Sequence, residues 1–272
     1  MFEEPYRWVE AVGNRRQYLN EQFQQGSPVV ALSYADGILL LTVSRGTPKL
    51  YEIYDRIGLG GMGHPADLEK LRFNLLEMAH VEGFNRSPSD VTGSRMVKYG
   101  LAPVIKQAFE EVYKAPFIVK ILLAELGTKA ERDAFITINY DGTFEETKGC
   151  AAIASTPAIQ SGVMGSLRQN ARLAISTLGP AVEAALRAWA LGSLAQGKDK
   201  EDQDNPKDSP DASPTTSPDA TAIEAHLRET LADKTIECAV LDRTAPGSSK
   251  YRALKIQEIN QLLPKQFLTR LS

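Results

Sequence analysis

Residues 26–63 read GSPVVALSYADGILLLTVSRGTPKLYEIYDRIGLGGMG. Two apolar runs, at 29–32 and 38–43, flank the sequence YADG at 34–37. Asp-Gly between apolar runs predicts a tight hairpin, because glycine supplies the positive φ that such a turn needs. A third apolar stretch, at 57–62, is rich in glycine. Glycines within a strand predict that another part of the chain packs very close to the backbone.

The chain on either side of this stretch alternates between helices and strands. Residues 7–25 form an amphipathic pattern that predicts a helix. Beyond the hairpin, proline at the first helical position indicates helix starts at His64-Pro65 and at Ser87-Pro88, and Pro103 predicts a kink in the second helix. The remaining elements are predicted as strands at 117–126, 134–140, 143–147 and 150–155, helices from 156 and from 179, a helix at 222–231, strands at 236–241 and 251–256, and a last helix at 259–263.

This order of elements suits an α+β fold made of two stacked antiparallel sheets, each covered by a pair of helices on its outer face. The nearly continuous apolar strands fit such a sandwich, because both faces of each sheet are buried. Residues 198–219 differ from the rest, since acids, lysines, prolines and serines dominate there. Such a segment buries too little apolar surface to offset the entropy of ordering, and we predict that it is disordered.

Composition excludes several classes of function. A net charge of −3 gives no electrostatic drive towards nucleic acid or an anionic membrane. No apolar run approaches the ~20 residues that span a bilayer. The first residues carry acids and no apolar core, so we expect no secretory signal. With Cys150 and Cys238 far apart, we expect reduced thiols and a cytoplasmic protein.

Motifs for metals, nucleotides and nucleophilic catalysis are missing. His64, His80 and His226 are isolated, without the spacing of metal ligands, so structural or surface roles are expected for them. The glycines at 58–63 do not match GxGxxG or a phosphate loop with its lysine, and GxSxG is absent. We therefore expect no metal and no cofactor.

One constellation could support chemistry. Ser27 follows Gly26 directly and opens the first strand, and Lys49 lies at the far end of the same hairpin. Cleavage between Gly26 and Ser27 would expose an α-amine that could act as base for the serine hydroxyl, with a lysine nearby. The alternative is a serine at a strand entry and a solvated lysine. The residues alone leave both interpretations open.

The stretches VVALSYADGILLL, PKLYEIYDRIGLGGMG, DLEKLRFNLLEMAHVEGFNRSPSDVTGSRMV and FIVKILLAELG resemble the α-type subunits of the bacterial proteasome, of the actinobacterial kind. The resemblance covers residues 7–195 and 233–263. It implies the four-layer αββα sandwich of the N-terminal-nucleophile hydrolases, as a single domain at 7–263 with terminal tails at 1–6 and 264–272. The segment 198–219 is longer than the family pattern leads us to expect and is interpreted as a tolerated surface insertion.

The resemblance also argues against catalysis. Catalytic β-type subunits of this family carry an N-terminal threonine, an acid at the end of the second strand and a lysine before the next strand. The matching positions are Ser27, Val43 and Lys49. Without a carboxylate at Val43 the lysine lacks the partner that catalysis needs, and Pro28 would constrain the new N-terminus. We therefore predict a subunit that is not an enzyme.

In α-type subunits the resemblance implies a homo-heptameric ring that caps the catalytic β-subunits. The implied gate residues are Met1, Phe2, Glu3, Glu4, Pro5 and Tyr6. A ring ATPase is expected to dock through its C-terminal tails, with Lys49 meeting the terminal carboxylate and Gly26 at the mouth of the pocket. Substrates would carry a small ubiquitin-like modifier. The alternatives are a self-processing hydrolase that uses Ser27, and a similar ring without a β partner.

Overall fold

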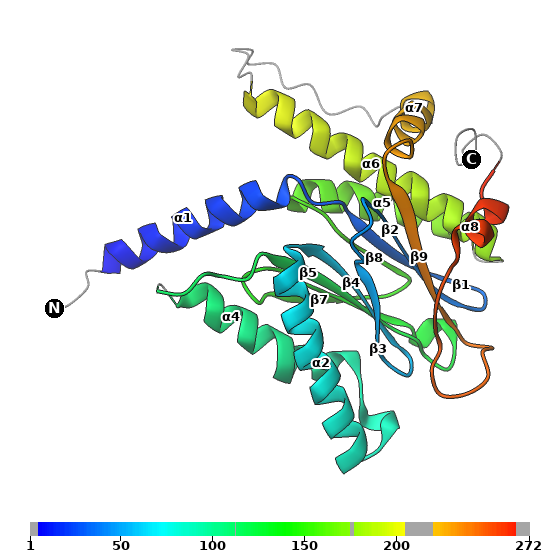
Figure 1. Cartoon of the computed structure of the whole chain (residues 1–272), viewed down its shortest axis with the longest axis horizontal. Helices are drawn as coiled ribbons and strands as arrows, with labels where there is room; N and C mark the ends of the chain where they lie inside the picture. The colour runs from blue at the N-terminus through cyan, green and yellow to red at the C-terminus, as the bar shows by residue number, and fades with distance from the viewer. Residues whose placement is uncertain (1–4, 112, 175–176, 205–219, 265–272) are drawn as a thin grey trace.

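The computed structural model describes residues 5–111, 113–174, 177–204 and 220–264. Two five-stranded antiparallel sheets are stacked face to face. The first has the order β10-β9-β2-β1-β8 and the second β3-β4-β5-β6-β7. Helices α5 and α6 cover the first sheet, and α2 and α4 cover the second (Figure 1). The predicted α+β, four-layer αββα sandwich is confirmed.

The first sheet contains the predicted hairpin. Its strands are β1 (Val29–Tyr34), β2 (Gly37–Ser44), β8 (Cys150–Ile153), β9 (Thr235–Asp242) and β10 (Tyr251–Ala253). Tyr34 pairs with Gly37, so the connection is as tight as Asp-Gly predicted. The reason given for the glycine was wrong, because Gly37 does not have positive φ. A Cβ at Gly37 would lie 1.9 Å from the carbonyl oxygen of Leu241 on β9, so close packing excludes any side chain there.

The second sheet contains β3 (Leu50–Tyr54), β4 (Ile57–Gly63), β5 (Val119–Glu125), β6 (Ala134–Ile138) and β7 (Phe144–Thr147). Close approach at the β4 glycines is confirmed. A Cβ at Gly60 would lie 2.6 Å from Val29 of the facing sheet, and one at Gly61 would lie 2.3 Å from Leu68 of α2. Gly63 has a φ of +130° and faces the Ile118 carbonyl oxygen. Small residues here let the layers pack closely on both faces of the sheet.

Only one of the two helix starts predicted from capping residues agrees with the structure. Helix α2 (Pro65–Asn85) begins where predicted, and the His64 side chain caps it. Ser87, in contrast, caps only the short 3-10 turn Pro88–Asp90. The helix itself begins after Thr92, as α3 (Gly93–Arg95), a π-helical turn (Met96–Leu101) and α4 (Ala102–Glu110). Fully buried Val91 interrupts the earlier start, and the π-helical turn precedes Pro103, where we expected an irregularity.

The predicted boundaries at 7–25 and at 198–219 need correction. Helix α1 (Pro5–Phe23) begins before residue 7 and therefore includes two residues of the predicted tail. Helix α6 (Leu178–Asp204) continues into the segment that we predicted to be disordered. Once a helix is nucleated and packed, each further residue that becomes ordered adds one hydrogen bond, so extension is easier than nucleation. Lysine and glutamate, which occur at the start of this segment, are also good helix formers. Residues 205–219 lie outside the described residues.

The remaining helices complete the structure. They are α5 (Pro157–Ala174), α7 (Ala220–Thr230) and α8 (Ile256–Leu262), together with the 3-10 turn Ala130–Arg132. Alternate residues of each strand serve different cores: Val30 and Leu32 pack towards α5 and α6, whereas Val29 and Ala31 pack between the sheets. None of the described helices is long and apolar enough to cross a membrane.

Helix α1 enters the sandwich only at its C-terminal end. Leu19 and Phe23 are fully buried in the core between the sheets, while the N-terminal half extends away from the sandwich (Figure 1). Arg15 holds the helix in place, since its guanidinium group donates to four carbonyl groups at the end of α4 and just beyond it, at 2.7–3.1 Å. Residues 5 and 6 therefore sit at the start of a helix anchored at its other end.

Candidate functional site

A pocket of about 410 Å³ opens where β2 ends and α2 begins. We call it the Lys49 pocket. It brings together the three positions that the sequence singled out, Ser27, Val43 and Lys49. The remaining lining residues are Gln25, Ser44, Arg45, Thr47, Pro48, Gly61, Gly63, Pro65, Leu68 and Lys234.

Lys49 is half-buried at the start of β3. Its backbone N–H donates to the Glu237 carboxylate on β9 at 2.9 Å, and the N–H of Leu50 does so at 2.8 Å. Burial lowers the pKa of the Lys49 ammonium group, which nearby Glu237 opposes. Burial likewise raises the pKa of Glu237, against the two backbone N–H groups that favour its charged form. The carboxylate is occupied by the backbone, and the Lys49 ammonium group forms no hydrogen bond or salt bridge within the described ranges.

Ser27 is held as a hydrogen-bond acceptor. Its Oγ accepts from the indole N–H of Trp189 at 3.0 Å and lies 3.4 Å from Oγ1 of Thr42. Thr42 in turn donates to the carbonyl oxygen of Pro28 at 2.7 Å. An indole and a hydroxyl cannot take a proton from serine at neutral pH. Val43, at the position of the family's acid, is fully buried in the apolar core, so no side chain in contact with Ser27 can act as its base.

Gly26 lines an adjoining pocket of about 160 Å³. We call it the Gly26 pocket. It shares Gln25, Ser27 and Lys234 with the Lys49 pocket. A Cβ at Gly26 would lie 2.8 Å from the Met62 side chain and 3.1 Å from the carbonyl oxygen of Phe23. Lys49 and Gly26, the two residues predicted to bind a partner, thus lie on neighbouring pockets. The atoms around Gly26 leave little room for a side chain there.

The three histidines occupy separate places. His64 caps α2, His80 contacts the Leu76 carbonyl and the Tyr54 ring, and His226 hydrogen-bonds Ser193 at 2.9 Å. Within the described residues no group of three metal-ligating side chains comes together. Of the predicted gate, residues 1–4 lie outside the described residues, whereas Pro5 and Tyr6 belong to α1.

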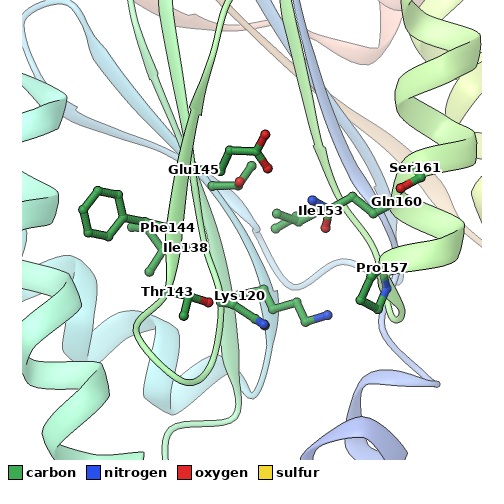
Figure 2. A pocket seen from close by; sticks show the side chains of 11 residues that line it. Lys120, Ile138, Thr143, Phe144, Glu145, Ile153, Pro157, Gln160 and Ser161 are labelled. Carbon is green, nitrogen blue, oxygen red and sulfur yellow. The ribbon is translucent and has the colours of Figure 1, made fainter.

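Sequence reasoning missed a third pocket, of about 390 Å³, which lies between the β6–β7 hairpin and the start of α5. Figure 2 shows Lys120 and Thr143 on one side and Pro157 and Gln160 on the other. Lys120 is only 5% exposed. In the sequence, Lys120 is the one charged residue within the apolar run 117–124, and this was the signal of an unusual position.

Lys120 contacts residues from several elements. Its Nζ donates to the carbonyl oxygens of Ala154 and Ser155, each at 2.8 Å. The ammonium group also lies 4.9 Å from the ring centre of Phe23 and 5.9 Å from that of Tyr140. Burial lowers its pKa from 10.5 to about 8, although Asp141 opposes the shift. The side chain therefore ties the end of α1 to β5 and β8, at a cost of desolvation.

Comparison with known proteins agrees with the geometry. The family model described as proteasome subunit matches residues 23–188. The chain belongs to the proteasome subunit family. It is 34% identical over 183 residues to the proteasome subunit alpha of Salinispora tropica, covering 66% of this chain and 67% of the relative. It is 31% identical over 196 residues to that of Actinosynnema mirum, covering 69% and 70%.

A longer match extends the similarity over most of the chain. The proteasome subunit alpha of Streptomyces coelicolor is 27% identical over 260 residues, which is 93% of this chain and 87% of the relative. These three relatives are alpha subunits, the non-catalytic subunits of the proteasome. The prediction that the chain is an α-type subunit and not an enzyme is thereby confirmed.

Proposed function

We propose that this chain forms a homo-heptameric α-ring that caps the catalytic β-rings of a proteasome core particle in the cytoplasm. The ring controls substrate entry and docks a ring ATPase through its C-terminal tails, in protein degradation directed by a ubiquitin-like modifier. The observation that carries the proposal is the Lys49 pocket, in which a half-buried ammonium group has no carboxylate to neutralise it in the lining.

The electrostatics of Lys49 support binding rather than catalysis. The pKa of its side chain is lowered by burial, so the charged form is incompletely solvated. A carboxylate from another chain would supply a charge-assisted hydrogen bond to such a group. The terminal carboxylate of an extended tail can reach it, because the pocket is open to solvent and bounded by the loop at residues 45–48. Catalysis, in contrast, lacks a side-chain base at Ser27 and a carboxylate at Val43.

The outer face of α2 supports contact with a β-type partner. Phe73, Val81 and Phe84 are 60%, 54% and 91% exposed, and their spacing places them on one side of the helix. Tyr99, on the neighbouring π-helical turn, is 70% exposed. Exposed apolar side chains that cluster in this way mark interaction surfaces. The proposal assigns this face to the catalytic ring, on the side of the sandwich opposite α6 (Figure 1).

Gating is proposed for Met1 to Tyr6 on the basis of how α1 is anchored. Phe23 and Leu19 fix one end in the core, and Arg15 fixes the middle to α4. Two apolar side chains near the other end, Trp8 and Val9, are 48% and 63% exposed. A helix fixed in this way would carry its first residues to a defined place in a ring.

Co-expression with the β-type partner tests the proposal. Deleting residues 1–6 should raise the cleavage of small peptides by the purified particle, because the entrance is opened. Replacing Lys49 by Ala should abolish the stimulation of protein degradation by the ATPase, whereas the exposed Lys129→Ala serves as matched control. Unchanged peptide cleavage after the deletion would contradict the gate, and full ATPase stimulation of K49A would contradict the docking site.

Two further measurements separate this function from its alternatives. Intact mass spectrometry would detect a species that begins at Ser27, which a self-processing hydrolase requires. Electron microscopy of the chain with and without its β partner would distinguish a capped core particle from a ring that works alone. We expect a full-length chain in stacked rings.

A further inference from the structure

Lys234 lies where the Lys49 pocket meets the Gly26 pocket, and it lines both of them. It stands in the short connection between α7 and β9, where its backbone N–H donates to the Thr230 carbonyl at 3.1 Å. The residue is half-buried. Its position gives one side chain access to both pockets.

The lining of the Lys49 pocket is basic. Arg45, Lys49 and Lys234 contribute three cationic side chains, and none of the lining residues is acidic. Arg45 is paired with Asp233 at 2.9 Å, on the exposed surface. Within the described part of the chain, no salt bridge engages the ammonium group of Lys49 or that of Lys234. Two cations are thus available to a bound anion.

These two ammonium groups influence each other. The pKa of Lys49 is lowered first by burial and further by Lys234, while Glu237 acts in the opposite direction. Lys234 also adds to the effect of burial in lowering the pKa of His226. A like charge near a partly dehydrated group disfavours its charged form, as Lys234 does for Lys49. A ligand with two negative charges would relieve this repulsion, whereas a single carboxylate would balance only one of the cations.

Glu237 does not provide that balance. Its carboxylate accepts from the backbone N–H groups of Lys49 and Leu50 and is absent from the lining of either pocket. The rest of the Lys49 pocket is suited to an apolar residue, since the exposed rings of Pro48 and Pro65 line it. The pocket therefore combines an apolar surface with two cations at different distances from the Gly26 pocket.

We propose that the segment seated here is acidic as well as free at its C-terminus: its terminal carboxylate meets Lys49, and an Asp or Glu side chain a few residues earlier meets Lys234. This inference rests on the proposed docking of a C-terminal tail and defines the chemistry of that tail. The last residue is apolar and packs against Pro48 and Pro65. The chain then leaves along the Gly26 pocket.

Labelled peptides test this on the full chain assembled with its β partner. The probes are fluorescein-labelled hexapeptides that end in leucine, with one glutamate at the second, third or fourth position from the end, and matched peptides with glutamine there. Fluorescence anisotropy gives each Kd at low salt. We expect at least one glutamate position to bind about tenfold more tightly than its glutamine match, as for a partly buried charge pair.

Variants assign the gain to Lys234. In Lys234→Met, which keeps the apolar stem, the glutamate and glutamine peptides should bind equally, and Lys234→Gln should behave in the same way. The exposed Lys129→Met is the matched control and should keep the tenfold preference. Size-exclusion chromatography shows that each variant still assembles.

Two results would overturn the inference. The first is equal affinity of the glutamate and glutamine peptides at every position. If both peptides then still lose affinity when their terminal carboxylate is amidated, the proposed function stays intact. Displacement of the peptides by inorganic phosphate at matching concentration would also overturn the inference, since the pocket would then bind free anions without reading a peptide. Loss of affinity on amidation in K49A would count against the proposed function instead.

Discussion

Replacing Lys120 by methionine tests how the buried lysine acts on the stability of the sandwich. Methionine keeps a similar length and removes the charge. The native ammonium group is 5% exposed, donates to Ala154 and Ser155 and contacts the Phe23 ring. Its pKa is lowered from 10.5 to about 8 because burial disfavours the charged form. Folding therefore carries a cost for Lys120 that depends on pH.

The direction in which stability changes with pH follows from how many protons the folded and unfolded chains bind. Below pH 8 the lysine is charged in both the folded and the unfolded chain, and the full cost of burial applies, about 3 kcal/mol for this shift. Between pH 8 and 10.5 the unfolded chain binds more protons than the folded one, so the free energy of unfolding rises with pH. From about pH 7 to about pH 9.5 the wild type should gain about 2 kcal/mol that the methionine variant lacks.

Urea denaturation of both proteins across that pH range gives the difference in unfolding free energy. Other titrating groups are common to both proteins and cancel in the difference. The exposed Lys129→Met, which should differ from the wild type by a constant amount, is the control. A difference for Lys120→Met that stays constant with pH would refute the conclusion that Lys120 is buried as a cation.

Two further predictions concern the anchoring of α1 and the β4 glycines. Arg15→Met should lower the free energy of unfolding by about 2–4 kcal/mol and expose α1 to trypsin, because four hydrogen bonds to carbonyl groups are lost. Arg15→Lys should recover only part of the lost stability, since one ammonium group cannot replace the several donors of a guanidinium group. Gly63→Ala should lower the free energy of unfolding by more than about 2 kcal/mol, because φ is +130° and the Cβ would meet a backbone oxygen. Gly13→Ala, where a Cβ would have nothing within 4 Å, should raise it by about 0.5–1 kcal/mol. Thermal unfolding measures both variants, and equal effects would contradict the packing argument.

Much of the fold could be predicted because its signals are local. Apolar periodicity and Pro or Gly at element ends indicated the order of helices and strands, and the glycines at 58–63 indicated closely packed layers. The frame of the candidate site was predictable in part for the same reason. Ser27 and Val43 lie close because β1 pairs with β2, whereas Lys49 precedes β3 in the other sheet and reaches the same pocket through the stacking of the two sheets.

What the sequence by itself determined was therefore the set of elements and the loss of the catalytic residues. Only the tertiary structure decided which distant groups complete the site. Trp189 reaches Ser27, Glu237 binds the backbone of Lys49, and Lys234 joins two pockets. These contacts arise because β9 pairs with β2 and α6 lies across the first sheet. Pairing between segments so far apart in the chain depends on global packing, which no local pattern encodes.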